Sequence, residues 1–194
     1  SADDVYVQPV GGLRRSLAGE WRFRTAAVTV SMTADKHQVD TLLFNAMIHP
    51  LQPYPLAGVI WYQGETNASE DGAYRYRDSF RTLIEGWRAQ WGSPRMPFLW
   101  AQLAAFHSGG DRLDTRGVVI ESPWATLRES QSAALALPAT GQAVTIDVGA
   151  ADDIHPRDKR TVGHRLALPA RRLYGDAGLA YSGPVFRDAE VRGA

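Results

Sequence analysis

Two continuous apolar runs most constrain what this chain can fold into. They read LAGVIWY at residues 56–62 and MPFLWAQL at residues 96–103, and a shorter run, AVTIDV, occupies residues 143–148. A strand that is apolar along its whole length is typical of a parallel sheet, in which both faces of each strand are covered. We therefore predict strands at these ranges, with the strand at 56–62 buried on both faces.

The segments between and after these runs have helical periodicity. In residues 74–91 the apolar side chains fall at steps of three and four: Tyr76, Phe80, Leu83, Ile84, Trp87 and Trp91. Residues 126–137 and 156–174 are predicted helices as well. Gly175 ends the last one, and Pro169 within it is expected to kink or shorten it. Strands that alternate with helices predict an α/β fold with a parallel sheet.

The N-terminal part of the chain has a different pattern. Short β-like alternation runs through residues 5–30, with a turn at Gly11 and Gly12. Residues 41–47 are predicted to form a short helix, which the prolines from Pro50 onward end. The chain therefore combines a short β-rich segment with an α/β region.

Composition excludes several classes of protein. Lys+Arg and Asp+Glu both total 21, so the chain has no basic field to favour nucleic acid or an anionic membrane. Without cysteine it has no disulfide, no thiolate nucleophile and no cysteine-based metal site. No apolar run approaches the roughly 20 residues of a membrane span, and no pair of histidines has metal-site spacing. No metal or organic cofactor is implied.

Polar residues follow the first predicted strand. QGETN, residues 63–67, comes directly after Tyr62 and combines a glycine with amide and carboxylate side chains. Ligands of open parallel sheets bind outside the carboxyl ends of the strands, and backbone or Asn side-chain N–H groups form oxyanion holes. The segment is therefore either part of a binding site or a polar turn that only ends a strand.

A second polar cluster surrounds His155. Asp152 and Asp153 precede this histidine, and Pro156 after it is a favourable first residue of a helix. The imidazole is then expected at a helix N-terminus, where the dipole disfavours the imidazolium and a nearby carboxylate opposes that effect. On one interpretation His155 is a general base. On the other, Asp153 caps the helix and His155 is a surface residue.

The helix at 126–137 and its entry carry weaker candidates. Arg128, Glu129 and Gln131 lie close together on this helix, and a solvated face is favoured over a cleft for them. Trp124, just before the helix, is a candidate platform for stacking on a sugar ring.

Several ordered blocks resemble one family. They are LFNAMIHPL (43–51), GVIWYQGETNA (58–68), YRYRDSFRTLIEGWR (74–88), PFLWAQLA (97–104), LRESQ (127–131) and DIHPRDKRTVGHRLAL (153–168). Together with LAGEWRF at 17–23 they resemble the sialate O-acetylesterase family, a branch of the SGNH hydrolases. The resemblance implies a three-layer, flavodoxin-like α/β domain at residues 41–194, incomplete at its N-terminal side. Residues 1–40 would be the end of a β-rich insertion or connecting segment.

The resemblance also implies roles for individual residues. His155 matches the general base, and Asp152 matches its carboxylate partner if the D-x-x-H pattern of SGNH hydrolases holds. Asp153 and Asp147 are alternative partners, and a Ser–His dyad is a further alternative. A separate set of residues matches the oxyanion and substrate-binding block: Gln63, Gly64, Glu65 and Asn67.

The nucleophile of the family has no match in this chain. It is the serine of a Gly-Gln-Ser-Asn block, and the chain has no such block and no G-D-S or G-x-S-x-G motif. We therefore expect the C-terminal part of a carbohydrate O-acetylesterase whose N-terminal fragment carries the serine. The resemblance implies an O-acetylated sialic acid or related glycan as substrate and a periplasmic or secreted location. The alternatives are an acetyl-xylan or other polysaccharide deacetylase and a non-catalytic carbohydrate-binding remnant.

Overall fold

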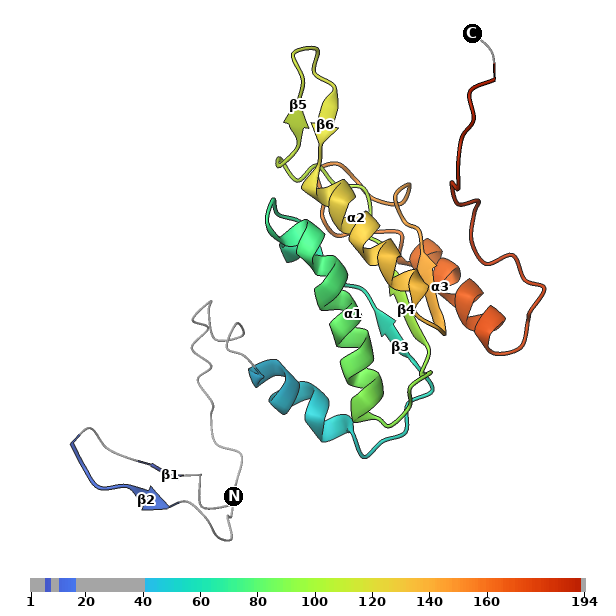
Figure 1. Ribbon diagram of the computed structural model, residues 1–194. Coiled ribbons are helices and arrows are strands. Elements are labelled where there is room, and N and C mark those ends of the chain that lie inside the picture. The colour runs from blue at the N-terminus through green and yellow to red at the C-terminus, as the bar shows by residue number, and fades with distance from the viewer. Residues whose placement is uncertain (1–5, 8–10, 17–40, 193–194) are drawn as a thin grey trace. The chain divides into compact units, whose positions relative to one another are not determined.

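The computed structural model describes residues 6–7, 11–16 and 41–192 (Figure 1). The chain divides into two units, Ser1–Ala46 and Met47–Ala194. In the first unit, β1 (Tyr6–Val7) pairs antiparallel with β2 (Arg15–Ser16), and the turn predicted between such strands contains Gly11, whose φ is 75°. The rest of the predicted β-like alternation, from residue 17 to residue 30, lies outside the described residues.

A parallel sheet forms the centre of the second unit. Its strands are β3 (Val59–Trp61), β4 (Phe98–Ala101) and β7 (Thr140–Ala143). They lie in the order β3–β4–β7, and both pairs are parallel. The predicted α/β fold with a parallel sheet is confirmed.

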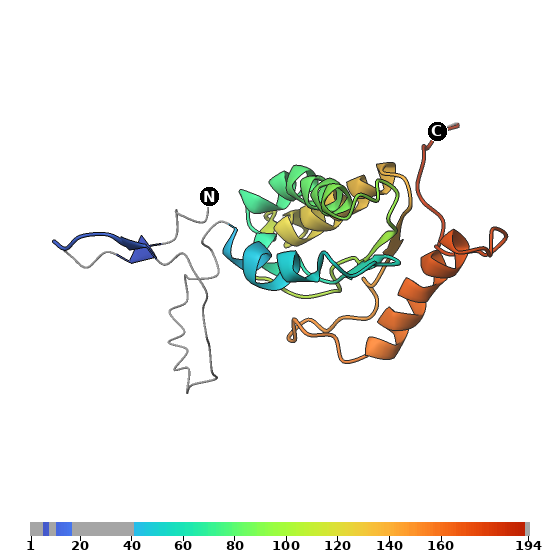
Figure 2. The ribbon, with the colours of Figure 1, turned by 90° about the horizontal axis from the view of Figure 1, so that it is seen from below.

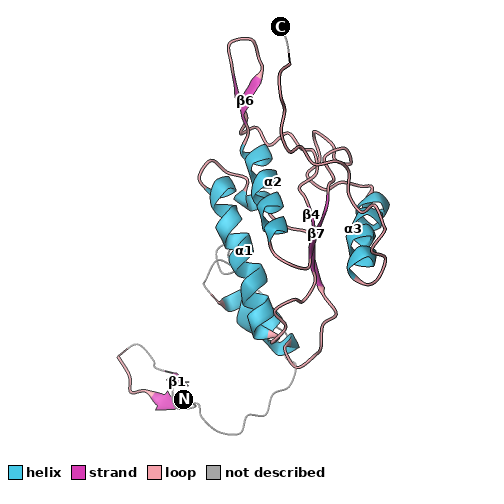
Figure 3. Ribbon diagram, turned by 45° about the vertical axis from the view of Figure 1, so that its right-hand side comes forward, coloured by secondary structure: helices cyan, strands magenta, loops and turns pink. Residues whose placement is uncertain are grey.

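Helices cover this sheet from both sides. α1 (Gly72–Gln90) and α2 (Pro123–Ala133), which the 3-10 turn η6 (Ala134–Ala136) extends, lie on one face. α3 (Lys159–Leu173) lies on the other face, as the views in Figure 2 and Figure 3 show. Right-handed crossovers that proceed in one direction along a sheet place successive helices on the same face. The outcome is the three-layer arrangement that the family resemblance implies.

Several short elements precede or interrupt these layers. The predicted helix at 41–47 is present as an irregular one, with a π-helical turn η3 (Phe44–Ile48) followed by a 3-10 turn η4 (His49–Leu51), so it continues past Pro50. A 3-10 turn, η5 (Glu65–Asn67), follows β3. β5 (Arg112–Leu113) and β6 (Val119–Glu121) pair antiparallel as a hairpin between β4 and α2.

β4 contributes side chains to two cores. Phe98 and Trp100 are fully buried against the face that α1 and α2 cover. Leu99 and Ala101 face α3 instead. The ring of Phe80 on α1 meets Trp100 edge to face with centroids 5.2 Å apart. The helical spacing in residues 74–91 therefore marks the buried face of α1, as predicted.

β3 is less covered than its apolar sequence predicts. Ile60 is 68% exposed, although its neighbour Val59 is buried. The reason is that α3 packs mainly on β4 and β7. β3 also forms an edge of the sheet in the described part of the chain. The prediction that this strand is buried on both faces is wrong.

The third strand lies earlier than predicted. The apolar alternation at 143–148 misleads, because Val144 and Ile146 are 42% and 52% exposed, and β7 ends at Ala143. A Cβ atom on Gly141 of β7 would lie 2.9 Å from Leu99 Cδ2 and closer still to Pro169. β7 therefore passes beneath α3 at a residue that has no side chain. Pro169 does not end α3, and its buried ring packs on this strand.

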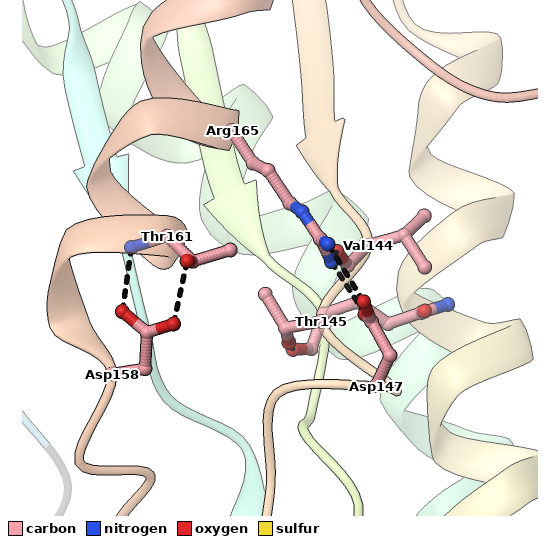
Figure 4. A network of polar contacts seen from close by, with 7 residues as sticks. Val144, Thr145, Asp147, Asp158, Thr161 and Arg165 are labelled. Atoms are coloured by element: carbon pink, nitrogen blue, oxygen red, sulfur yellow. Dashed lines mark hydrogen bonds and ion pairs between the residues drawn. The ribbon is translucent and has the colours of Figure 1, made fainter.

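Two helix starts also differ from prediction, and capping explains both. α2 begins at Pro123, earlier than expected, because Ser122 Oγ accepts the N–H of the third residue of the helix at 3.3 Å. α3 begins at Lys159, later than expected. Asp158 caps it, with Oδ1 accepting the Thr161 N–H at 2.9 Å (Figure 4).

Candidate active site

His155 lies in an open hollow between β7 and α3. The hollow has a volume of about 620 Å³ and is lined by Val148, Ala150, Asp152, Asp153, His155, Arg157 and Asp158. The side chain of His155 is 86% exposed. Because α3 begins at Lys159, the imidazole is not at a helix N-terminus, and Asp153 does not cap the helix. Those two predictions are wrong, and the chemistry of His155 depends on the loop instead.

Asp153 is the carboxylate that contacts His155. Its Oδ1 accepts the backbone N–H of His155 at 2.9 Å and lies 3.8 Å from Nδ1 of the imidazole. That backbone hydrogen bond, together with the charge of Arg157, holds the pKa of Asp153 below its usual value. An ionised carboxylate at this position favours the imidazolium that forms when the ring takes a proton. Asp152 makes no hydrogen bond or ion pair with any described residue.

Asp147 is engaged elsewhere. Arg165 of α3 binds its two carboxylate oxygens at 2.5 Å and 2.7 Å (Figure 4). The same guanidinium donates to the carbonyl of Val144 at 2.7 Å. The hydrogen bonds from Arg165 to the carboxylate lower the pKa of Asp147 to about 2. Its carboxylate therefore fixes the start of the loop to α3, and the geometry does not direct it at His155.

The turn after β3 has both occupied and open donor groups. Gly64 has a φ of 151°, which favours glycine, and its N–H donates to the Glu65 carboxylate at 2.9 Å. That N–H is therefore occupied. The Asn67 side chain is exposed, and its amide makes no hydrogen bond with any described residue. The Gln63 side chain is likewise exposed and its amide makes no hydrogen bond with any described residue. Within the predicted block, Gln63 and Asn67 are therefore the residues whose amide protons are available to an oxyanion.

A buried glutamine ties this turn to the next strand. Gln131 of α2 has no exposed surface, and its Oε1 accepts the Leu103 N–H at 2.9 Å. Its Nε2 donates to the carbonyl of Gln63 at 3.5 Å. The predicted solvated face is therefore wrong for Gln131, whose spacing from Trp124 and Leu127 already marks the buried face of a helix. Trp124 is buried as well, so the predicted sugar platform at this residue is also wrong.

A contact across the sheet edge brings the two polar clusters close together. The ammonium of Lys159 lies over the ring of Tyr62, 5.1 Å from its centroid. Tyr62 directly precedes Gln63, and Lys159 follows His155 by only four residues. The loop that leaves β7 therefore returns toward the end of β3. The hollow that His155 lines does not itself include residues 63–67.

The loop before His155 is fixed by backbone contacts with the segment after β4. The N–H of His107 donates to the carbonyl of Ala151 at 3.0 Å. A Cβ atom on Gly149 would lie 2.7 Å from the carbonyl carbon of Ala105 and 2.5 Å from its nitrogen. Thr145, fully buried, donates its hydroxyl proton to the carbonyl of Gln102. The sequence analysis did not single out Thr145, Gly149 or Ala151, and the glycine within DVGAADD (147–153) was the available signal.

The arrangement allows proton transfer. An exposed imidazole beside an ionised carboxylate accepts a proton from a hydroxyl and later returns it, and the Asn67 amide can stabilise an oxyanion. No serine lines the hollow. Within the described ranges, no group of three or more His, Asp or Glu side chains is placed to hold a metal ion. No helix there is both long and apolar enough for a membrane crossing.

Comparison with known proteins identifies the family. The profile described as carbohydrate esterase, sialic acid-specific acetylesterase, matches residues 26–171. Sialate O-acetylesterase of Mus musculus is 36% identical over 169 residues, which are 78% of this chain and 30% of that protein. The Homo sapiens protein of the same name is 37% identical over 174 residues, 80% of this chain and 31% of that protein.

A solved structure agrees with these sequence matches. The crystal structure of a carbohydrate acetylesterase from Xanthomonas citri is 60% identical and aligns with a TM-score of 0.72, covering 77% of this chain and 33% of that chain. The chain thus spans about a third of the length of the relatives it matches. Both the sequence and the fold confirm the predicted resemblance, and the chain belongs to the sialic acid-specific acetylesterase family of carbohydrate esterases.

Proposed function

We propose that this chain supplies the general base and an oxyanion donor of a carbohydrate O-acetylesterase. The nucleophilic serine comes from an N-terminal segment of the same enzyme. The observation that carries the proposal is the exposed imidazole of His155, which has the ionised Asp153 at 3.8 Å and lies in a hollow without a serine. The substrate is an O-acetylated sialic acid or a related glycan, as the names of the family and its relatives suggest.

The reaction proceeds in two halves. The serine Oγ attacks the acetyl carbonyl carbon while His155 takes the hydroxyl proton, and the Asn67 amide donates to the oxyanion. The tetrahedral intermediate then collapses. The sugar oxygen leaves with the proton from His155, and the acetyl group stays on the serine. In the second half His155 deprotonates a water molecule, which attacks the acetyl-serine, and acetate leaves as the serine regains its proton.

The orienting carboxylate is Asp153 or Asp152. Contact with His155 favours Asp153, whereas the D-x-x-H spacing favours Asp152. Asp147 is disfavoured because Arg165 engages both its oxygens. Asp→Asn substitutions separate the two: loss of the orienting carboxylate lowers kcat by about 10²- to 10⁴-fold. If neither substitution lowers kcat, the site works as a Ser–His dyad.

The edge of β3 supports a place for the serine segment. Ile60 on this strand is 68% exposed, and β3 has a partner on one side within the described sheet. A strand that pairs parallel with β3 would end at the same sheet edge as QGETN. The contact between Lys159 and Tyr62 brings the His155 loop toward that position. In this proposal residues 41–194 are the C-terminal part of the esterase domain, and residues 1–40 end a β-rich insertion.

The test uses the complete enzyme, with the serine segment present, and p-nitrophenyl acetate as substrate. His155→Ala should lower kcat on the order of 10⁴-fold or more, because both proton transfers lose their base. His164→Ala, an exposed histidine on α3, is the matched control and should retain wild-type turnover. Near wild-type turnover of His155→Ala would remove His155 from the mechanism.

Further assays define the substrate, the class of protein and its location. Release of acetate from O-acetylated sialic acid, compared with release from acetylated xylan, distinguishes a sialate esterase from a polysaccharide deacetylase. A complete enzyme that binds sugars but releases no acetate from any of these would instead be a carbohydrate-binding protein.

The family resemblance further suggests a periplasmic or secreted enzyme, which fractionation of the producing cells tests.

A further inference from the structure

A second hollow lies at the same edge of the sheet, on the opposite side from α3. Its volume is about 400 Å³, within the range of small-molecule sites. The start of α1, the base of the β5–β6 hairpin and the start of α2 enclose it, with Glu70, Tyr74, Arg112, Glu121 and Thr126 among its lining residues. None of these residues belongs to the His155 hollow.

The second hollow lies close to the proposed oxyanion block along the chain. Glu70 follows Asn67 by three residues. The segment between them is tightly folded, because the Gly72 N–H donates to Ser69 Oγ at 3.0 Å. A Cβ atom on Gly72 would lie only 2.7 Å from the carbonyl oxygen of Asn67. A ligand held beside Glu70 and Tyr74 is therefore near the turn that carries Asn67.

The lining chemistry suits a sugar ring. Tyr74 is 62% exposed, and the guanidinium of Arg77 lies 4.7 Å from its ring centroid. This cation–π contact holds the orientation of the ring. An exposed aromatic ring presents a flat apolar surface to the C–H face of a pyranose. Carboxylates and a hydroxyl at the rim accept hydrogen bonds from sugar hydroxyls.

The charges of the hollow balance, which suits a neutral ligand. Glu121 pairs with Arg112 at 2.8 Å, and this pair is neutral overall. Glu70 makes no ion pair with any described residue, and the guanidinium of Arg77 on the Tyr74 ring is the positive charge that balances it nearby. The hollow therefore has no excess positive charge to attract a sialic acid carboxylate, whereas the hydroxyls of a neutral sugar would donate to the glutamates.

We propose that this hollow binds the neutral sugar that is linked to the acetylated residue, so the enzyme recognises an oligosaccharide and not the acetylated sugar alone. The inference rests on the proposed function for its catalytic meaning. Binding of the neutral sugar does not depend on the catalytic residues. Tyr74 provides the stacking surface, and the Glu70 carboxylate accepts hydrogen bonds from the sugar hydroxyls.

The first arm of the test measures equilibrium binding of unacetylated disaccharides, lactose and xylobiose, to this chain by NMR titration. We expect saturable binding of at least one of them, with shifts at the start of α1. Tyr74→Ala should weaken it about tenfold, the effect of one lost aromatic contact, and Glu70→Gln should weaken it as well. Tyr74→Phe keeps the ring and should bind as the wild type does.

Tyr54→Ala is the matched control, because Tyr54 is 66% exposed and lies before β3, at the opposite end of the strand from the turn. It should leave binding unchanged. The proposal is overturned if the wild-type chain shows no saturable binding of either disaccharide. It is overturned equally if Tyr74→Ala binds as tightly as the wild type.

The second arm links the hollow to catalysis. In the complete enzyme, Tyr74→Ala should lower kcat/KM for an O-acetylated oligosaccharide about tenfold relative to kcat/KM for p-nitrophenyl acetate. An unchanged ratio would refute a role in substrate recognition. If the wild-type enzyme hydrolyses no acetyl ester at all, the proposed function fails, while disaccharide binding in the first arm still decides whether the hollow is a sugar site.

Discussion

Gly149→Ala tests whether contacts distant from the chemistry position the general base. The new Cβ atom would lie 2.5 Å from the nitrogen of Ala105 and 2.7 Å from its carbonyl carbon. Non-bonded heavy atoms reach their optimum near 3.5 Å, so the two backbone segments must separate by about 1 Å. The φ of Gly149 is not in the left-handed region, so the collision alone, and not backbone strain, is responsible.

The separation has two measurable consequences. Overpacking of this kind costs about 1–3 kcal/mol, and loss of the His107 to Ala151 hydrogen bond adds about 1 kcal/mol. The free energy of unfolding should therefore fall by about 2–4 kcal/mol. His155 lies six residues beyond Gly149 on the same loop. A displacement of about 1 Å at a catalytic group lowers turnover by roughly 10²-fold.

Urea unfolding of this chain measures the stability change, and hydrolysis of p-nitrophenyl acetate by the complete enzyme measures the change in kcat. Gly163→Ala is the matched control, because nothing lies within 4 Å of its Cβ position. It lies inside α3, so alanine there should stabilise the chain by about 0.5–1 kcal/mol and leave kcat unchanged. If Gly149→Ala unfolds and turns over as the wild type does, the loop contact does not position His155.

Two further substitutions test the scaffold. Arg88→Ala should lower the free energy of unfolding by about 2–4 kcal/mol, because the buried guanidinium donates to the carbonyls of Met96 at 3.0 Å and Pro138 at 2.6 Å. Arg81→Ala, which breaks an exposed pair with Glu85, should cost less than about 0.5 kcal/mol, and equal urea midpoints for the two variants would contradict this account. Asp147→Asn tests the pairing with Arg165. Because the folded-state pKa of Asp147 is lowered from 3.8 to about 2, the pair stabilises the fold above pH 3.8 and this contribution is lost as the pH falls toward 2. The stability gap between wild type and Asp147→Asn should be constant near neutral pH and narrow below pH 3.8 in pH-dependent urea unfolding, and a gap that is independent of pH would refute it.

Patterns within one element predict that element well. α1 is recognised because its apolar residues recur at helical steps, and Phe80 and Ile84 are buried where that spacing places them. β4 is recognised because each of its residues is buried, as its apolar run predicts. In both cases the burial of a side chain follows from its own position in a regular element.

Boundaries that depend on tertiary contacts are not visible in such patterns. Asp153 and Asp158 are both acceptable helix caps by residue type. α3 begins after the second one, because Asp158 accepts the Thr161 N–H whereas Asp153 accepts the N–H of His155 in the loop. The position of β7 also depends on a tertiary contact. Gly141 of this strand lies beneath Pro169 of α3, where there is no room for a side chain. The exposure of Ile60 likewise depends on which strands α3 covers.

The sequence by itself determined the α/β class, the layered order of elements, the family, and His155 as the candidate base. These follow from periodicity and from ordered blocks, which are properties of neighbouring residues. The tertiary structure alone decided that Asp153 contacts the imidazole, that Arg165 engages Asp147, and that Glu65 occupies the Gly64 N–H. Hydrogen bonds and charges act over a few ångströms, so the choice among chemically equivalent carboxylates depends on how distant segments pack, which spacing along the chain does not specify.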